Sequence, residues 1–218
     1  MKKIGLLFCS ACIILAACNG SGADEKAKTD SVTTPKKDGT ANTGTTAPMD
    51  TAAMNKAWHD FKTPGDMHKW LEKTNGTWEA ELSQWMDPSA PAMKSKSTIV
   101  QSSIMGGRYV TSKFSGTVFG QPMQGQSTTG YDNARKLFVS TWIDDLGTGV
   151  VFMTGTYDST TKTLNLKGLQ TEPTTGKEVD IREEMTIIDN DSYTMTMYST
   201  GMDGKEMKFL EGTYKRKK

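Results

Sequence analysis

The chain has 218 residues, with 26 Lys and Arg, 25 Asp and Glu, three Cys and a formal net charge of +1. This balance excludes the broad basic field with which nucleic-acid-binding proteins neutralise phosphates. The cysteines are Cys9, Cys12 and Cys18, so the rest of the chain has neither a thiolate metal site nor a cysteine nucleophile.

The N-terminus has the pattern of a secretory signal peptide over residues 1–17. Two lysines precede an apolar run at 4–15, which is shorter than the roughly 20 residues that span a bilayer. The sequence Leu-Ala-Ala-Cys at 15–18 resembles the lipobox of bacterial lipoproteins. The resemblance implies that Cys18 carries a lipid that anchors the protein to a membrane of the bacterial cell envelope, with the outer membrane favoured. The alternative is an ordinary signal peptide with a chance cysteine.

Residues 18–57 have the composition of a disordered tether. They are mostly Thr, Ala, Lys, Asp, Gly and Ser, with two prolines and almost no large apolar side chain. Such a segment cannot bury enough apolar surface to offset the entropy lost on ordering. All five Trp and all six Tyr lie at or after Trp58. We therefore expect one folded domain over residues 58–218.

One short helix is predicted at the start of this domain. Thr63 is a suitable N-cap, and Pro64 suits the first helical position. Trp70 and Leu71 fall on one face with helical spacing, and the Asn-Gly pair at 75–76 is a stop signal.

The remainder of the domain predicts about ten strands. Trp78, Ala80 and Leu82 alternate with polar residues, which is the period of a strand with one buried face. The later runs predicted as strands are 97–104, 109–117, 123–131, 137–144, 149–157, 163–169, 179–188, 193–200 and 205–214. Hairpin-length loops separate them, so the predicted fold is all-β, an antiparallel up-and-down barrel of eight to ten strands. A sandwich is the alternative.

Two family resemblances support a barrel. Gly76 and Trp78 open the first strand directly after the helix, as Gly-x-Trp does in lipocalins. That resemblance implies a structural role for both residues, and for a basic residue of the last strand, Lys215 or Arg216, packed across the Trp.

The second resemblance covers residues 66–217. The chain is similar to the bacterial domain-of-unknown-function family 1579 in a set of short motifs. These are His68-Lys69-Trp70-Leu71, Gly76-Thr77-Trp78, Met105-Gly106-Gly107-Arg108-Tyr109, Gly130-Tyr131-Asp132, Trp142-Ile143-Asp144, Gly147-Thr148, Asp203-Gly204-Lys205-Glu206 and Tyr214-Lys215-Arg216. The resemblance implies a lipocalin-like barrel and brings no activity, so no catalytic residue is carried over.

A ligand pocket is predicted around Arg108, Tyr109, Tyr131, Trp142 and Asp144. Arg108 follows two glycines, and the aromatic residues are close to it in the strand ladder. An inward-pointing Arg108 needs a partner, because an unpaired buried charge is costly. Asp144 is the expected partner; the alternatives are an anionic group of a ligand or an exposed Arg108.

No catalytic, metal or cofactor site is predicted. Both histidines, His59 and His68, precede the barrel, so a haem-type axial ligand on a late strand is missing. The sequence has no Gly-x-Ser-x-Gly motif. We expect a lipid-anchored envelope protein that binds a small apolar or amphipathic ligand. The alternative is a non-enzymatic structural or protein-interaction module with a solid barrel; an enzyme is the third hypothesis.

Overall fold

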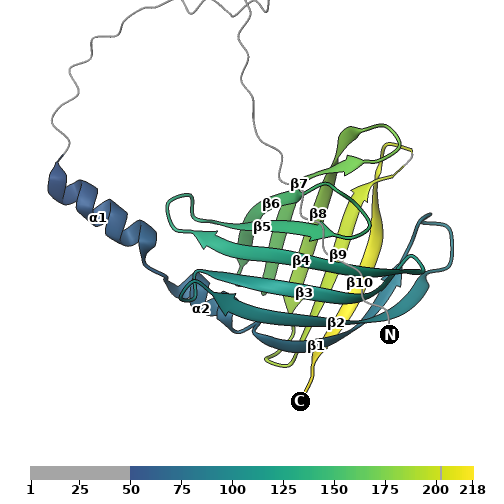
Figure 1. Ribbon diagram of the computed structural model, residues 1–218, viewed down its shortest axis with the longest axis horizontal. Coiled ribbons are helices and arrows are strands. Elements are labelled where there is room, and N and C mark those ends of the chain that lie inside the picture. The colour runs from purple at the N-terminus through teal and green to yellow at the C-terminus, as the bar shows by residue number, and fades with distance from the viewer. Residues whose placement is uncertain (1–49, 202) are drawn as a thin grey trace, which may run out of the picture. The chain divides into compact units, whose positions relative to one another are not determined.

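The protein folds into a closed barrel of ten antiparallel strands (Figure 1). The computed structural model describes residues 50–201 and 203–218, so the expected signal peptide, Cys18 and most of the tether lie outside the described residues. The strands are β1 (Gly76–Gln84), β2 (Met93–Ile104), β3 (Tyr109–Val118), β4 (Gln121–Asp132), β5 (Leu137–Asp144), β6 (Val151–Asp158), β7 (Thr163–Glu172), β8 (Lys177–Ile187), β9 (Ser192–Thr200) and β10 (Glu206–Arg216).

Each strand pairs with the next along the chain, and β10 pairs with β1 to close the barrel. In the closing pair Trp78 lies opposite Arg216 and Leu82 opposite Gly212. Figure 1 shows that β1–β5 cross β6–β10 at a steep angle, as in a flattened barrel. The closed ladder confirms the predicted up-and-down barrel, and the sandwich alternative is not the one adopted.

Two helical segments precede the barrel, α1 (Thr51–Lys62) and α2 (Asp66–Glu72). α1 begins inside the range assigned to the tether. The predicted helix cap was wrong, because Thr63 ends α1 and Gly65 is the N-cap of α2. The Gly65 N–H donates to Nδ1 of His68 at 3.0 Å, which satisfies a donor that the first turn of α2 leaves free. Burial lowers the pKa of His68, which keeps Nδ1 available as an acceptor.

Hydrogen bonds hold the C-terminal end of α1 to the barrel, and none of the α1 side chains is buried. The side-chain amide of Asn133 donates to the backbone oxygens of Asp60 and Thr63, at 3.0 and 2.8 Å. Arg108 donates to the backbone oxygen of Lys62 at 2.7 Å. Two turns of the barrel therefore hold the α1–α2 junction. Neither described helix is long and apolar enough to cross a membrane.

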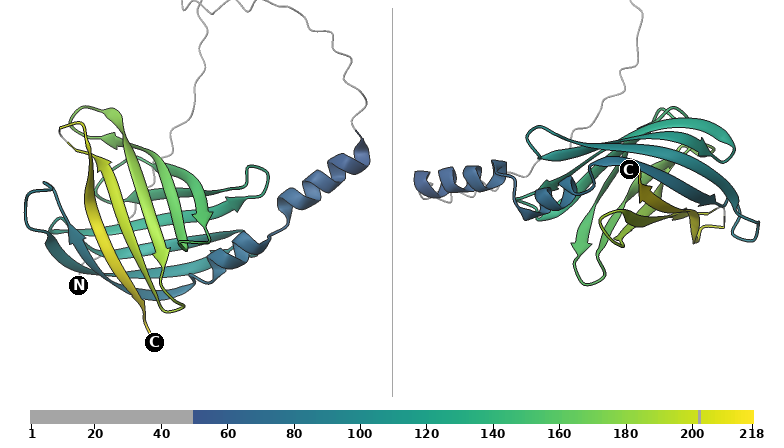
Figure 2. Two further views of the ribbon diagram at one scale, coloured as in Figure 1. Left: turned by 180° about the vertical axis from the view of Figure 1, so that it is seen from behind. Right: turned by 90° about the horizontal axis from the view of Figure 1, so that it is seen from below.

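α2 closes one end of the barrel, beside the start of β3 and the end of β4 (Figure 2). Trp70 of α2 packs inward against Phe138 and Tyr157, with ring centroids 5.4 and 4.5 Å apart. Tyr131 packs against the same phenylalanine at 5.0 Å. These aromatic side chains form a plug at this end of the barrel.

Along each strand, apolar side chains alternate into the barrel. In β1 the inward residues are Trp78, Ala80, Leu82 and Gln84, and each is nearly inaccessible to solvent. The amide of Gln84 donates to the hydroxyl of Ser95 at 2.9 Å and accepts from the N–H of Phe119 at 2.6 Å. A buried polar side chain therefore has partners at the end of the barrel far from the plug.

Candidate functional site

The barrel encloses a cavity of about 570 Å³. Leu71 and Thr74 border it at the plugged end, and Phe119, Leu146 and Pro173 border it at the opposite end. Leu146 is exposed as well as cavity-lining, so the cavity meets solvent there. We call this end the mouth. A volume of this size is within the range of about 300–1,000 Å³ that small-molecule sites occupy.

The cavity wall is mostly apolar. Its aliphatic, thioether and aromatic side chains are contributed by both halves of the barrel; they include Leu82, Ile99, Val110, Phe114, Val118, Met123, Trp142, Val151, Met153, Leu164, Leu166, Val179, Ile181, Met185, Met195, Met197, Phe209 and Leu210. Methionine is flexible and polarizable, so a wall rich in it adapts to ligands of irregular shape.

Three carboxylates line the cavity: Asp144, Glu172 and Glu183. Asp144 accepts hydrogen bonds from Nε1 of Trp142 at 2.7 Å and from the N–H of Leu146 at 3.0 Å. Glu172 accepts from the hydroxyl and N–H of Thr174, and these bonds lower the pKa of Glu172 to about 2. Both of these acids therefore have partners near the mouth. None of the described lining residues is Lys, Arg or His.

Glu183 is different, because it lies deep in the barrel without a partner. Within β8 it follows the inward residues Val179 and Ile181, and it lies opposite Leu166 on β7 and Met197 on β9. No hydrogen bond or ion pair joins its carboxylate to another residue of the described chain. The surface that its side chain retains faces the cavity. Burial raises the pKa of Glu183 to about 7.

Two tyrosines and a glutamine form a polar region of the same cavity. The rings of Tyr193 and Tyr214 stack with centroids 4.4 Å apart. Gln101 donates from Nε2 to the hydroxyl of Tyr193 at 3.5 Å, while its Oε1 is buried with no partner in the described residues. Burial raises the pKa of both tyrosines, and the negative charge of Glu183 adds to that rise. Gln101 Oε1 is thus a buried acceptor that lacks a donor in the described residues.

Three of the five predicted pocket residues point into the barrel. Trp142 and Asp144 line the cavity near the mouth. The ring of Trp142 lies over Gly125 of the neighbouring strand, where any Cβ would collide with it. Tyr131 also faces inward, but it belongs to the plug, where it packs against His68 and Phe138.

The other two predicted pocket residues lie outside the cavity, which corrects the expected grouping. Tyr109 is on the outer face of β3, where its side chain is exposed. Arg108 donates to the backbone oxygens of Met105 and Lys62, so it neither enters the barrel nor pairs with Asp144. The strand register explains the separation: Tyr109 pairs with Gly130 at the plugged end, whereas Asp144 lies near the mouth.

Sequence reasoning missed Glu183 and Gln101, although the pattern held a signal for the first. Val179, Ile181, Glu183 and Met185 share the period of a strand face, and three of the four are apolar. A glutamate in register with core residues has to point inward. Gln101 likewise lies two residues after the inward residue Ile99. Polar residues are common near strand ends, so this spacing alone does not indicate that Gln101 points inward.

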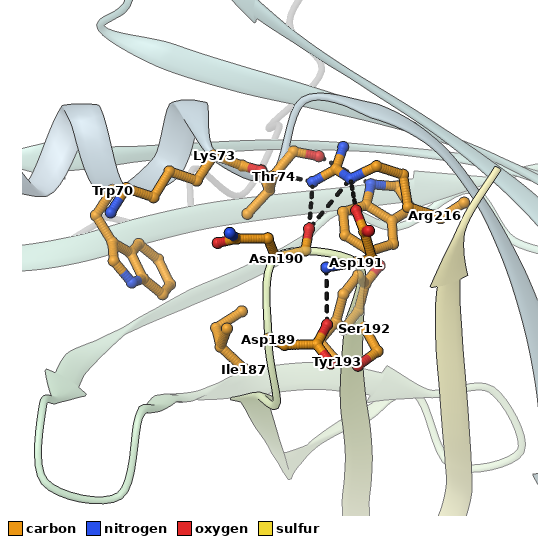
Figure 3. Close-up of a pocket in the computed structure, with 11 residues that line it drawn as sticks. Trp70, Lys73, Thr74, Ile187, Asp189, Asn190, Asp191, Ser192, Tyr193 and Arg216 are labelled. Carbon is orange, nitrogen blue, oxygen red and sulfur yellow. Dashed lines mark hydrogen bonds and ion pairs between the residues drawn. The ribbon is translucent and has the colours of Figure 1, made fainter. Parts of the chain in front are cut away.

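A smaller hollow of about 310 Å³ lies outside the plugged end (Figure 3). Arg216 crosses it. Its guanidinium bonds the backbone oxygens of Lys73 at 2.9 Å, Asn190 at 2.9 Å and Asn75, and pairs with Asp191 at 3.2 Å. Of the two basic residues expected over Trp78, the structure therefore has Arg216. Because the guanidinium that crosses the hollow is engaged by these groups of the protein, we assign the hollow a structural role.

The described residues contain no group of three or more His, Cys, Asp or Glu side chains placed to hold a metal ion. The cavity can bind a molecule by apolar contact and hydrogen bonding. Its lining, within the described chain, contains no histidine that could act as a base for the serines Ser112, Ser127 or Ser140.

Among the solved structures that share the fold are two from M. tuberculosis and Guillardia theta. The Rv2717c protein of M. tuberculosis is 15% identical, with a TM-score of 0.55 over 72% of this chain and 100% of that one. The S-type phycobiliprotein lyase CPES of Guillardia theta is 12% identical, with a TM-score of 0.51 over 71% of this chain and 94% of that one. At these identities the likeness concerns the fold alone. No curated protein matches the chain significantly. The model of the protein family of unknown function DUF1579 matches residues 63–216, so the chain belongs to that family.

Proposed function

We propose that this protein is an exported, lipid-anchored barrel that binds a small apolar or amphipathic molecule in its interior. The cavity of about 570 Å³ carries the ligand-binding part of the proposal. Barrels of this kind enclose one small ligand, whereas a barrel filled by its own side chains does not. The alternative, a structural module, would have a barrel filled by its own side chains, and a cavity of this size does not favour it.

The composition of the wall supports an apolar ligand. Aliphatic, aromatic and methionine side chains make up most of it, and a few polar groups are placed among them. The hydroxyls of Thr129 and Ser140 bond each other at 2.9 Å, and the amide of Gln170 donates to Ser199 at 2.8 Å. These pairs are satisfied without a ligand, so they leave the apolar surface to determine binding.

The anchoring part of the proposal rests on the sequence. A basic start, an apolar run at 4–15 and the Leu-Ala-Ala-Cys sequence at 15–18 together fit a lipoprotein signal peptide, with Cys18 as the lipidated residue. Multiple acyl chains give stable membrane attachment. The outer membrane is the favoured site within the bacterial cell envelope, and the protein then holds its ligand close to a membrane.

Binding of N-phenyl-1-naphthylamine tests the ligand-binding part. This neutral dye fluoresces in apolar cavities, and we expect saturable binding with one site per chain. Ser127 faces the cavity and has no side-chain hydrogen bond within the described residues. A Ser127→Trp variant should fill the cavity and lose at least tenfold in dye affinity.

Gln126→Trp is the matched control, because its neighbour Gln126 points outward from the same strand and is exposed. It should bind the dye as the unmodified protein does. Equal affinity for the dye in all three proteins, or no saturable binding to any of them, would contradict the proposed cavity function. Circular dichroism checks that each variant is folded.

A further inference from the structure

The charges that face the cavity are all negative. Asp144, Glu172 and Glu183 line it, and no cationic side chain of the described chain does. A carboxylate or phosphate head group entering this space would meet like charges in a medium of low dielectric constant, where repulsion is strong. An acid-lined cavity therefore disfavours fatty acids and other anionic amphiphiles, and favours neutral or cationic ones.

Glu183 is placed to bind a head group. Its neighbours across the strands are Leu166 and Met197, and its neighbours on its own strand are Ile181 and Met185. An apolar surrounding without hydrogen bonds makes an ionised carboxylate costly unless a partner arrives. Within the described residues no partner is present, although the cavity gives access to the carboxylate.

A second polar side chain of the cavity lining, Gln101, has an acceptor without a donor. Gln101 Oε1 is buried and unpaired in the described part of the chain, and Gln101 Nε2 already donates to the Tyr193 hydroxyl. A primary ammonium group has three N–H donors and no acceptor. One such group could bond the carboxylate of Glu183, while an alkyl or aromatic body fills the Met- and Leu-rich space.

We propose that the barrel selects apolar molecules that carry a primary amine, and that Glu183 binds the ammonium head group inside the cavity. This inference rests on the proposed ligand-binding function and names the ligand class for the same site. Glu183 is the specificity determinant in it, and the apolar wall supplies the remaining affinity.

The proposal implies that amine binding depends on pH. The titratable groups facing Glu183 are the hydroxyl of Tyr193 on β9 and that of Tyr214 on β10; the facing residues of β7 are Leu164, Leu166 and Gln170. Neither tyrosine ionises near neutral pH, because burial raises the pKa of each. Glu183 itself, with its pKa raised to about 7 by burial, is protonated at pH 5.5 and ionised at pH 8.5. An alkylammonium keeps its charge at both values, as lysine does.

Displacement of N-phenyl-1-naphthylamine by three ligands of equal chain length tests the inference: decylamine, decanol and decanoate. At pH 8.5 we expect decylamine to bind at least tenfold more tightly than decanoate and more tightly than decanol. Decylamine should lose about thirtyfold in affinity at pH 5.5, because binding then requires that Glu183, with its pKa of about 7, release a proton. The affinity of decanol should change less than threefold between the two values.

Glu183→Gln keeps the shape of the side chain and removes its charge. This variant should lose at least tenfold in decylamine affinity at pH 8.5, lose the pH dependence, and keep its decanol affinity. Asp180→Asn is the matched control, because Asp180 is three residues before Glu183 on the same strand and is exposed on the outer face. It should behave as the unmodified protein does.

Each remaining outcome separates the two proposals. Decanol binding with no preference for decylamine, or decylamine binding unchanged in Glu183→Gln, overturns the amine proposal and leaves the cavity function in place. A loss of decylamine binding in Asp144→Asn but not in Glu183→Gln also overturns it, because the head group would then lie at the mouth. Failure of all three ligands to displace a dye that binds saturably overturns the amine proposal, whereas absence of saturable dye binding overturns both proposals.

Discussion

The guanidinium carbon of Arg216 lies 4.1 Å from the centroid of the Trp78 ring, at the place where the last strand meets the first. The two residues are also directly opposite each other in the strand register. Gly76 is required beside them, because a Cβ there would meet the guanidinium at 2.5 Å and its φ is +132°. A cation–π contact, backbone hydrogen bonds and an ion pair thus converge where the barrel closes.

Replacement of Arg216 by Ala should lower the free energy of unfolding by about 2–4 kcal/mol. The substitution removes the contact with Trp78 and leaves the carbonyls of Lys73, Asn75 and Asn190 without their donor. Urea denaturation followed by Trp fluorescence measures the change. Arg216→Lys should recover less than half of the loss, since an ammonium lacks the planar fork of donors. Lys215→Ala, at an exposed neighbouring position, is the control.

Arg108→Ala should leave ligand binding intact and loosen the α1–α2 junction. Arg108 donates to the backbone oxygen of Lys62, outside the cavity, so the affinity for N-phenyl-1-naphthylamine should change less than twofold. Limited trypsin digestion should cut faster after Lys62, because that backbone loses a hydrogen bond. Asn133→Ala, which removes the other contact to the junction, should have the same effect. A tenfold loss of dye affinity in Arg108→Ala would place this residue in the site after all.

Glu183→Gln should change the dependence of stability on pH. Burial raises the pKa of Glu183 from 4.5 to about 7, so the folded state holds this proton more tightly than the unfolded state does. The resulting stabilisation is complete below pH 4.5 and is lost as the pH rises through 7. The raised pKa changes the free energy of unfolding by at most about 3 kcal/mol, since a pKa change of one unit corresponds to about 1.36 kcal/mol.

The unmodified protein should therefore become less stable, relative to Glu183→Gln, between pH 5 and pH 8. Urea denaturation of both proteins at these two values gives the comparison, in which the titration of all other groups cancels. A difference that does not change with pH would show that Glu183 titrates normally, as it would if water or a residue outside the described chain solvated it.

Cys18→Ser should abolish lipid attachment if the chain is processed as proposed. Cells that express the full chain and are fed an alkyne-labelled fatty acid should yield a labelled protein, and the variant should give none. The variant should move from the membrane fraction to the soluble fraction, because acyl chains anchor this chain in the proposal. Cys12→Ser is the control, since Cys12 lies within the expected signal peptide. An unlabelled parent protein would contradict the lipid anchor.

The barrel itself could be predicted from the sequence because its signals are local. A period of two in hydrophobicity identifies each strand, and turn residues separate the strands. All ten predicted strands overlap observed ones, from β1 to β10. The helix cap was misplaced because Thr63, a common capping residue, bonds backward to the oxygen of His59, and His68 satisfies the Gly65 N–H instead.

The site was harder to predict, because the residues that share it are far apart in the chain. Arg108 directly precedes β3 and Asp144 ends β5, so the two residues are close along the order of strands. The strand register nevertheless places them toward opposite ends of the barrel. Register depends on turn geometry and on which side chains fit together in three dimensions. Conversely, Gln101 and Tyr193 are 92 residues apart, and only the closed barrel brings them together.

Closure by β1 and β10 also constrains how the chain folds. The register joins Trp78 to Arg216, which are separated by nearly the whole domain, and such non-local pairing slows folding because the intervening loop must close first. The pairing cannot form until residues 206–216 are present. A chain that is exported as we propose would therefore stay short of its final fold during translocation, and the barrel would be completed only after the last strand has crossed.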